Sequence, residues 1–155
     1  MPSPHEGRAR RRPGIPARRR WGQNFLASGE TAERIVAAAR VGPGDGALTR
    51  PLADRVACVA AVEIDPLRAR ALAAELSGRP NVRVLEGDAL ARPFRDWLDA
   101  AGCAAPAVLV ANLPYNVATP ILTTAIESPG AIRRSVATVQ REVARRFVAR
   151  PGDEG

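Results

Sequence analysis

The sequence predicts an α/β fold in which a mainly parallel sheet is covered by helices. Two observations predict this class. From Trp21 onward, short apolar runs alternate with segments of helical periodicity. Polar residues directly follow several of the apolar runs, as they do at the carboxyl edge of a parallel sheet, where ligands bind. The chain has 155 residues, 46% of them hydrophobic, which is enough for about one domain with one core.

The composition restricts the chemistry that the chain can perform. Cys58 and Cys103 are too few for a disulfide framework and are expected to be small buried apolar residues, and His5 alone provides no set of metal ligands. No apolar stretch approaches the ~20 residues needed to span a bilayer, and the N-terminus has no secretory-type apolar core. We expect a cytoplasmic monomer without a metal or a membrane partner.

Residues 1–20 are expected to be a disordered arginine-rich tail, followed by one globular domain over residues 21–155. The tail carries +6 of the formal net charge of +7 and has little to bury. Such a segment is attracted to polyphosphate by counterion release, although a solvated tail without a ligand is an equal alternative. The candidate RNA-binding residues are Arg10, Arg11, Arg12, Arg18, Arg19 and Arg20.

The first elements surround a glycine-rich loop at residues 42–46. Before the loop, an apolar series predicts a helix that begins near residues 28–31 and includes Ile35, Val36 and Ala39. After the loop, a short helix is expected up to Leu52. Glycines allow a ligand to approach the backbone closely, and an ordinary turn is the alternative.

The next three elements form a strand, a helix and a second strand. The continuous apolar run over residues 56–64 is typical of a strand buried on both faces, with Glu63 near its end. Pro66 begins an amphipathic helix that is expected to stop at Gly78. The second strand covers residues 82–85 and leads to Asp88.

The last elements continue the alternation. A helical segment around Trp97 is followed by a third buried strand over residues 107–111. Thr119 is expected to cap a helix that Pro120 begins. A fourth strand is expected over residues 135–139, and a final helix over residues 141–148.

Three polar residues follow or close three different predicted strands. Because parallel strands end at one edge of a sheet, Glu63, Asp88 and Asn112 are expected to lie at the same edge. Glu63 could accept hydrogen bonds from the two hydroxyls of a ribose, and Asp88 could accept one from an exocyclic amine such as that of adenine. The alternatives are a solvated strand end for Glu63 and a capping or turn role for Asp88.

Residues 112–115, Asn-Leu-Pro-Tyr, form the most specific motif. They present an amide, a proline-rigidified turn and an aromatic ring just beyond a buried strand. The amide oxygen of Asn112 and a backbone carbonyl near Leu113 could accept both N–H groups of an adenine N6 amine, so that its lone pair faces an activated methyl group. Tyr115 could stack on the base, and the alternative is a turn whose Tyr115 packs into the core.

These residues resemble the signatures of the ribosomal RNA adenine N6-dimethyltransferases, a family that includes the erythromycin-resistance methylases. The matching segments are residues 22–26, 62–65, 87–89, 112–120 and 139–144. The resemblance covers residues 18–152. It implies a Rossmann-like core that uses S-adenosylmethionine.

The resemblance also implies site residues and a substrate. S-adenosylmethionine would be contacted by Asn24, Leu26, Gly42, Glu63, Asp88 and Asn112, and the catalytic residues would be Asn112, Leu113 and Tyr115. Residues 112–116 and 140–143 look more like the housekeeping enzymes, which dimethylate two adjacent adenines near the 3′ end of 16S-type RNA. Small-subunit ribosomal RNA or its precursor is therefore the expected partner.

Two departures from the family pattern keep alternatives open. About ten residues, including the first, central strand, are missing before Gly42 when the chain is aligned to the family pattern, and Arg40 stands where a glutamate is usual. The chain also stops at Gly155, before the remaining strands and a smaller helical domain. We thus expect a truncated core without its first strand and C-terminal helical domain. The alternatives are a 23S RNA methylase of the macrolide-resistance type, which residues 44–52 resemble, and a catalytically impaired RNA-binding remnant.

Overall fold

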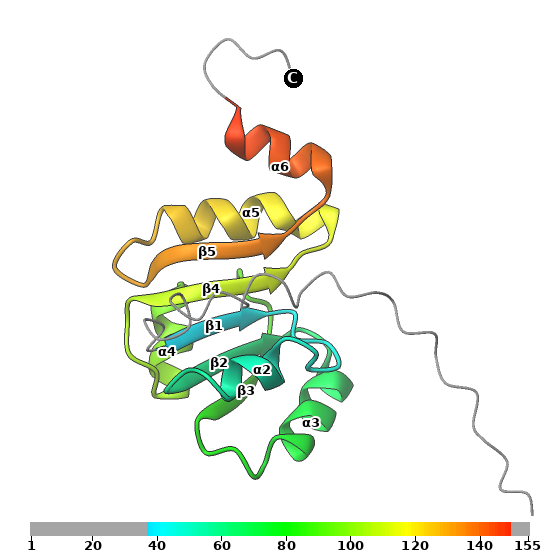
Figure 1. Ribbon diagram of the computed structural model, residues 1–155, viewed down its shortest axis with the longest axis vertical. Coiled ribbons are helices and arrows are strands. Elements are labelled where there is room, and N and C mark those ends of the chain that lie inside the picture. The colour runs from blue at the N-terminus through cyan, green and yellow to red at the C-terminus, as the bar shows by residue number, and fades with distance from the viewer. Residues whose placement is uncertain (1–36, 150–155) are drawn as a thin grey trace, which may run out of the picture.

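Five parallel strands form a single sheet with helices on both faces in the computed structural model, which describes residues 37–149 (Figure 1). The strand order is β3-β2-β1-β4-β5. The strands are β1 (Ala37–Val41), β2 (Cys58–Glu63), β3 (Val82–Glu86), β4 (Ala107–Asn112) and β5 (Ile132–Thr138). The helices are α2 (Thr49–Ala53), α3 (Pro66–Glu75), α4 (Phe94–Ala101), α5 (Tyr115–Ile126) and α6 (Arg141–Val148). The predicted α/β class is confirmed.

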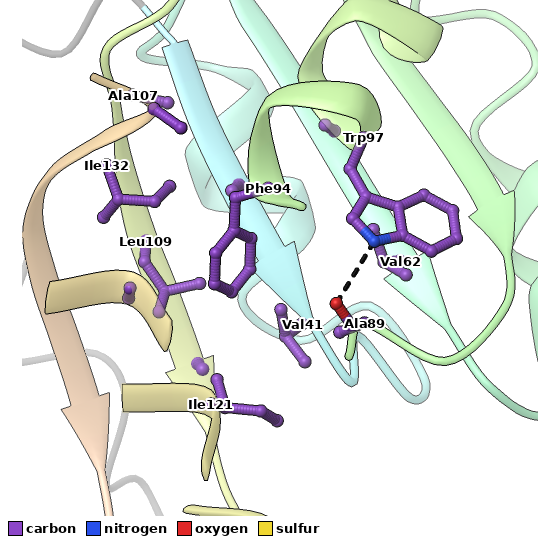
Figure 2. Packing of buried hydrophobic residues seen from close by; sticks show 14 of the residues in the cluster. Val41, Val62, Ala89, Phe94, Trp97, Ala107, Leu109, Ile121 and Ile132 are labelled. Atoms are coloured by element: carbon purple, nitrogen blue, oxygen red, sulfur yellow. Dashed lines mark hydrogen bonds between the residues drawn. The ribbon is translucent and has the colours of Figure 1, made fainter. Parts of the chain in front are cut away.

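The sheet separates two hydrophobic cores. On one face, α4 and α5 pack against the strands, and Phe94 lies between Leu109 and Val41 (Figure 2). On the other face, α2 and α3 cover the strands with Leu52 and Leu72. Burial on both faces explains why β2 and β4 are continuous apolar runs in the sequence.

The expected absence of the first strand is wrong. Residues 37–41, expected to be the end of a helix, form β1 at the centre of the sheet, paired with Cys58–Val62 of β2 and with Val108–Ala111 of β4. Backbone N–H and C=O groups of β2 and β4 need partners, and any five-residue extended segment can supply them. Small alanines fit this crowded central position, so tertiary pairing overrides the helical preference of the alanine run.

Two boundaries also differ from the sequence prediction. Helix α5 begins at Tyr115, and Pro120 lies inside it, whereas Thr119 and Pro120 were expected at its start. Hydrogen bonds from the N–H groups of Val117 and Ala118 to the carbonyl of Pro114 form its first turn. Strand β5 begins at Ile132, before residue 135, because an edge strand accommodates charged side chains that hide its apolar pattern.

Cys58 and Cys103 form a disulfide, although the sequence predicted two unpaired buried cysteines. Cys58 begins β2 and Cys103 follows α4, and their Cα atoms are 5.5 Å apart, within the range that a disulfide requires. The sequence separation of 45 residues carries no local signal of this pairing. Cys103 is buried as expected, and Cys58 is partly buried.

Two searches of the described residues complete the description of the fold. No helix between residues 37 and 149 has the length and apolar character needed to cross a membrane. The same residues contain no group of three or more His, Cys, Asp or Glu side chains that could hold a metal ion.

Candidate functional site

The carboxyl edge of the sheet brings the predicted site residues together. Gly42 follows β1, Glu63 ends β2, Asp88 comes two residues after β3, and Asn112 ends β4. Backbone hydrogen bonds join neighbouring strand ends, from Gly42 N to Val62 O at 3.0 Å and from Gly87 N to Glu63 O at 2.9 Å. The predicted convergence of Glu63, Asp88 and Asn112 on one edge is therefore confirmed.

The carboxylate of Glu63 is buried under the glycine-rich loop. The residue is 4% exposed, and its Oε2 accepts a hydrogen bond from the backbone N–H of Gly44 at 3.0 Å. Its Oε1 accepts one from the N–H of Asp65, also at 3.0 Å. Glu63 is thus a fixed acceptor at the end of β2, and each of its oxygens retains capacity for a second hydrogen bond.

The glycine-rich loop packs against α3 at one glycine and borders open space at two others. At Gly46, an added Cβ would lie 2.6 Å from a methyl carbon of Leu72, so the loop packs tightly on α3. At Gly42 and Gly44, which have φ values of +59° and +54°, an added Cβ would meet no atom within 4 Å. The loop backbone therefore adopts conformations that favour glycine and leaves open space beside it.

Asp88 lies in a turn that Trp97 supports. One carboxylate oxygen of Asp88 accepts a hydrogen bond from Leu90 N at 2.9 Å, which is the turn role considered in the sequence analysis. The Trp97 indole lies so close to Gly87 that an added Cβ would be 2.6 Å from the ring, and its Nε1 donates to Ala89 O at 3.2 Å (Figure 2). The buried indole therefore sets the path of the chain on both sides of Asp88.

Residues 112–115 join the end of β4 to the start of α5. The Leu113 side chain is buried, and its backbone N–H donates to Thr138 O of β5 at 2.9 Å. Asn112 is exposed, and Tyr115, the first residue of α5, is 49% exposed. Tyr115 therefore does not pack into the core, and a rigid turn presents both polar side chains to solvent.

Among residues 37–149, Arg40 is the one charged residue that the fold buries in the site although the sequence analysis did not name it as a site residue. It lies in β1, is 3% exposed, and its Nη1 donates to the carbonyls of Val41 and Val110. Burial lowers the pKa of Arg40 to about 10, while the negative charges of Glu63 and Asp45 act in the opposite direction. Because arginine side chains are usually exposed, the residue type did not indicate that Arg40 would be buried.

Ile64 is a second feature that the sequence analysis missed. It follows Glu63 directly, and the residue is 67% exposed at the same edge. A strand buried on both faces needs no apolar residue beyond its end, and this excess could have indicated an apolar contact surface. Asn24, Leu26 and the six tail arginines lie outside the described residues, so their roles stay predictions.

Comparison with known proteins identifies a family whose sequences this chain matches. The sequence model described as ribosomal RNA adenine dimethylase matches residues 15–155. The relatives include small-subunit ribosomal RNA methyltransferases A from Moorella thermoacetica, 43% identical, and from Geobacter sulfurreducens, 37% identical. These alignments cover 92% and 91% of this chain and 54% of each relative. The chain thus spans about half the length of the curated relatives it matches.

Two solved structures share the fold. A 23S ribosomal RNA methyltransferase, ErmE, matches with a TM-score of 0.61 and 34% identity over 75% of this chain and 45% of that one. A dimethyladenosine transferase from Plasmodium falciparum matches with a TM-score of 0.62 and 26% identity over 79% of this chain and 43% of that one.

Proposed function

Because the chain belongs to the ribosomal RNA adenine dimethylase family, we propose that it binds S-adenosylmethionine and directs its methyl group to the N6 amine of an adenine in ribosomal RNA. One observation carries the proposal. Asn112 and Tyr115 are exposed at the end of β4, on the edge where Glu63 ends β2. The proposal includes a cytoplasmic location.

The residues at this edge fit the adenosine part of the cofactor. Glu63 offers carboxylate oxygens to ribose hydroxyls, and the exposed face of Ile64 offers an apolar surface to the adenine ring. The open space beside Gly42 and Gly44 lets a ligand approach the loop backbone. We assign the adenine amine of the cofactor to Asp88, in a turn held by Trp97.

When bound, S-adenosylmethionine supplies an activated methyl group on a sulfonium sulfur. The amide oxygen of Asn112 and the backbone carbonyl of Leu113 would accept the two N–H groups of the target amine, which directs its lone pair toward the methyl group. Tyr115 would hold the extruded base by stacking. These groups would contribute by positioning the reactants, because holding reactants in a productive geometry lowers the entropic part of the barrier.

The proposed substrate is small-subunit ribosomal RNA or its precursor, with two adjacent adenines near the 3′ end as targets. Both of the bacterial relatives described above are small-subunit methyltransferases. The alternative substrate is 23S ribosomal RNA, which the similarity to ErmE favours.

A methyl-transfer assay tests the proposal. The full chain is incubated with S-adenosylmethionine and either 16S or 23S RNA, and N6-methylated adenosines are measured by mass spectrometry. We expect dimethyladenosine in 16S RNA and none with Asn112→Ala. Methylation of 23S RNA alone would support the alternative substrate, and absence of product with both RNAs would contradict the proposal.

A non-catalytic RNA-binding role is the second candidate, favoured by the seven arginines among residues 1–20. It predicts steeply salt-dependent RNA binding that survives Asn112→Ala and Tyr115→Ala but is lost when residues 1–20 are deleted. RNA-binding titrations over a range of salt concentrations separate the two candidates. For an enzyme, RNA binding also depends on the residues of the sheet edge, so that the two alanine variants weaken it.

A further inference from the structure

A buried guanidinium lies at the centre of the carboxyl edge. Arg40 belongs to β1, two residues before Gly42, and Nη1 donates across the sheet to Val110 O of β4 at 3.2 Å. Strand order reverses between β1 and β4, because the chain adds β2 and β3 on one side of β1 and β4 and β5 on the other. Ligands of parallel α/β sheets bind at such a switch point. The guanidinium therefore joins the two strands between which a ligand is expected.

The positive charge of Arg40 is incompletely compensated. Among residues 37–149, Nη1 is paired with backbone carbonyls, Nε is buried without a hydrogen-bond partner, and no ion pair includes Arg40. Two acids act on Arg40. Glu63 shares its charge with the N–H groups of Gly44 and Asp65, and Asp45 is exposed, so that water and salt screen its charge. Because Arg40 is 3% exposed, water and salt screen its field far less than that of a surface arginine.

We infer that Arg40 makes the S-adenosyl site prefer the neutral product S-adenosylhomocysteine over the cationic S-adenosylmethionine. The inference rests on the proposed function, because it requires that the carboxyl edge takes an S-adenosyl group. Methyl transfer breaks the bond between sulfur and the methyl carbon, leaves that electron pair on sulfur, and forms a bond between the methyl carbon and the N6 nitrogen of the target adenine, which then loses one proton to water. The bound ligand thus loses one positive charge while the rest of it is unchanged, and only the sulfonium form is repelled by Arg40.

The size of the effect follows from Coulomb's law. Two unit charges about 10 Å apart in a medium of effective dielectric constant about 20 change an affinity on the order of tenfold. A preference of this size for S-adenosylhomocysteine slows the reaction cycle, because the product stays bound longer. Arg40 is accordingly a residue that determines ligand specificity through the electrostatic field of its charge.

Calorimetric titration of both ligands tests the inference. The chain is titrated with S-adenosylmethionine and with S-adenosylhomocysteine as wild type, Arg40→Gln and Arg40→Met, with Arg83→Gln as the matched control. Arg83 is an exposed residue of β3, so its substitution removes the same formal charge from the surface. We expect both Arg40 variants to shift the ratio of the two dissociation constants toward S-adenosylmethionine on the order of tenfold, and Arg83→Gln to leave the ratio unchanged.

The ratio is insensitive to partial unfolding, because a smaller folded fraction weakens both apparent affinities by the same factor. Binding of both ligands with the same ratio in the wild type and the Arg40 variants would overturn the inference and leave the cofactor site in place. If the wild type bound neither ligand, the proposed function and the inference would both fail. A shift produced equally by Arg83→Gln would show a general charge effect and would also overturn the inference.

Discussion

The backbone N–H of Gly44 donates a hydrogen bond of 3.0 Å to Oε2 of Glu63, which fastens the glycine-rich loop to the acid at the end of β2. The same carboxylate accepts the N–H of Asp65 at 3.0 Å. One buried side chain thus orders the loop after β1 and the turn before α3. A substitution that alters this carboxylate is therefore expected to affect both the conformation of the loop and the binding of a ligand.

Glu63→Gln tests this coupling. The amide NH2 of glutamine cannot accept a hydrogen bond, so one of the two backbone N–H groups loses its partner. We expect affinity for S-adenosylmethionine to fall by about tenfold or more and the free energy of unfolding to fall by about 1–2 kcal/mol. Calorimetry and urea denaturation measure the two effects. Glu127→Gln, at the exposed end of α5, is the control, and a Glu63 variant that behaves like it would contradict the assignment.

Gly87→Ala is expected to disturb the turn that carries Asp88. The new Cβ would lie 2.6 Å from the Trp97 ring, which is itself buried and held by its bond to Ala89. We expect a loss of about 1–3 kcal/mol in the free energy of unfolding, in the range of overpacked cores. Gly78→Ala is the matched control, because its Cβ would meet no atom within 4 Å. Equal unfolding midpoints for the two variants would refute the close contact.

Arg40→Met is expected to stabilise the chain. Burial lowers the pKa of Arg40 to about 10, so the folded state disfavours the protonated guanidinium. This cost is fully present below pH 10 and is relieved as the pH rises above about 10 toward the higher, ordinary pKa of arginine in the unfolded chain. Methionine removes it, and we expect a gain of about 1–3 kcal/mol at pH 7 by urea denaturation. A loss of stability would show that the bonds to Val41 and Val110 outweigh the burial of charge.

The Cys58–Cys103 disulfide is expected to contribute to stability through loop closure. For its sequence separation of 45 residues, the chain-entropy relation gives about 4 kcal/mol, and measured disulfides commonly give about 2–4 kcal/mol. We expect a reducing agent to lower the melting temperature of the wild type. The double variant Cys58→Ala/Cys103→Ala is the control, since its melting temperature cannot depend on reduction. Equal sensitivity of both proteins would exclude this contribution.

Tyr115→Ala is expected to impair methyl transfer while leaving stability nearly unchanged. Tyr115 is 49% exposed, so its truncation leaves little cavity, whereas stacking on a base is worth about 1–3 kcal/mol. We expect kcat/KM for RNA to fall by about 10- to 100-fold. Tyr115→Phe keeps the ring and should retain most of the activity. Full activity of the alanine variant would remove Tyr115 from the site.

Much of the fold and part of the site could be predicted from local patterns. Strands β2 and β4 are continuous apolar runs, and Asp65, which caps α3 through Leu67 N, stands directly before Pro66. Because parallel strands end at one edge, the convergence of Glu63, Asp88 and Asn112 also followed from their order in the sequence. The support of Asp88 by Trp97 did not follow, because it has no local pattern. The exposure of Ile64 was missed, although an apolar residue beyond the end of a buried strand could have indicated it.

The sequence by itself determined which segments are strands, helices and turns wherever apolar periodicity, proline and glycine act within a few residues. Only the tertiary structure decided that residues 37–41 form the central strand, that Cys58 meets Cys103, and that Arg40 is buried. Each of these depends on partners between about 20 and 70 residues away. A strand's hydrogen bonds, a disulfide and the desolvation of a charge are properties of neighbours in space, which the short-range pattern of the chain does not specify.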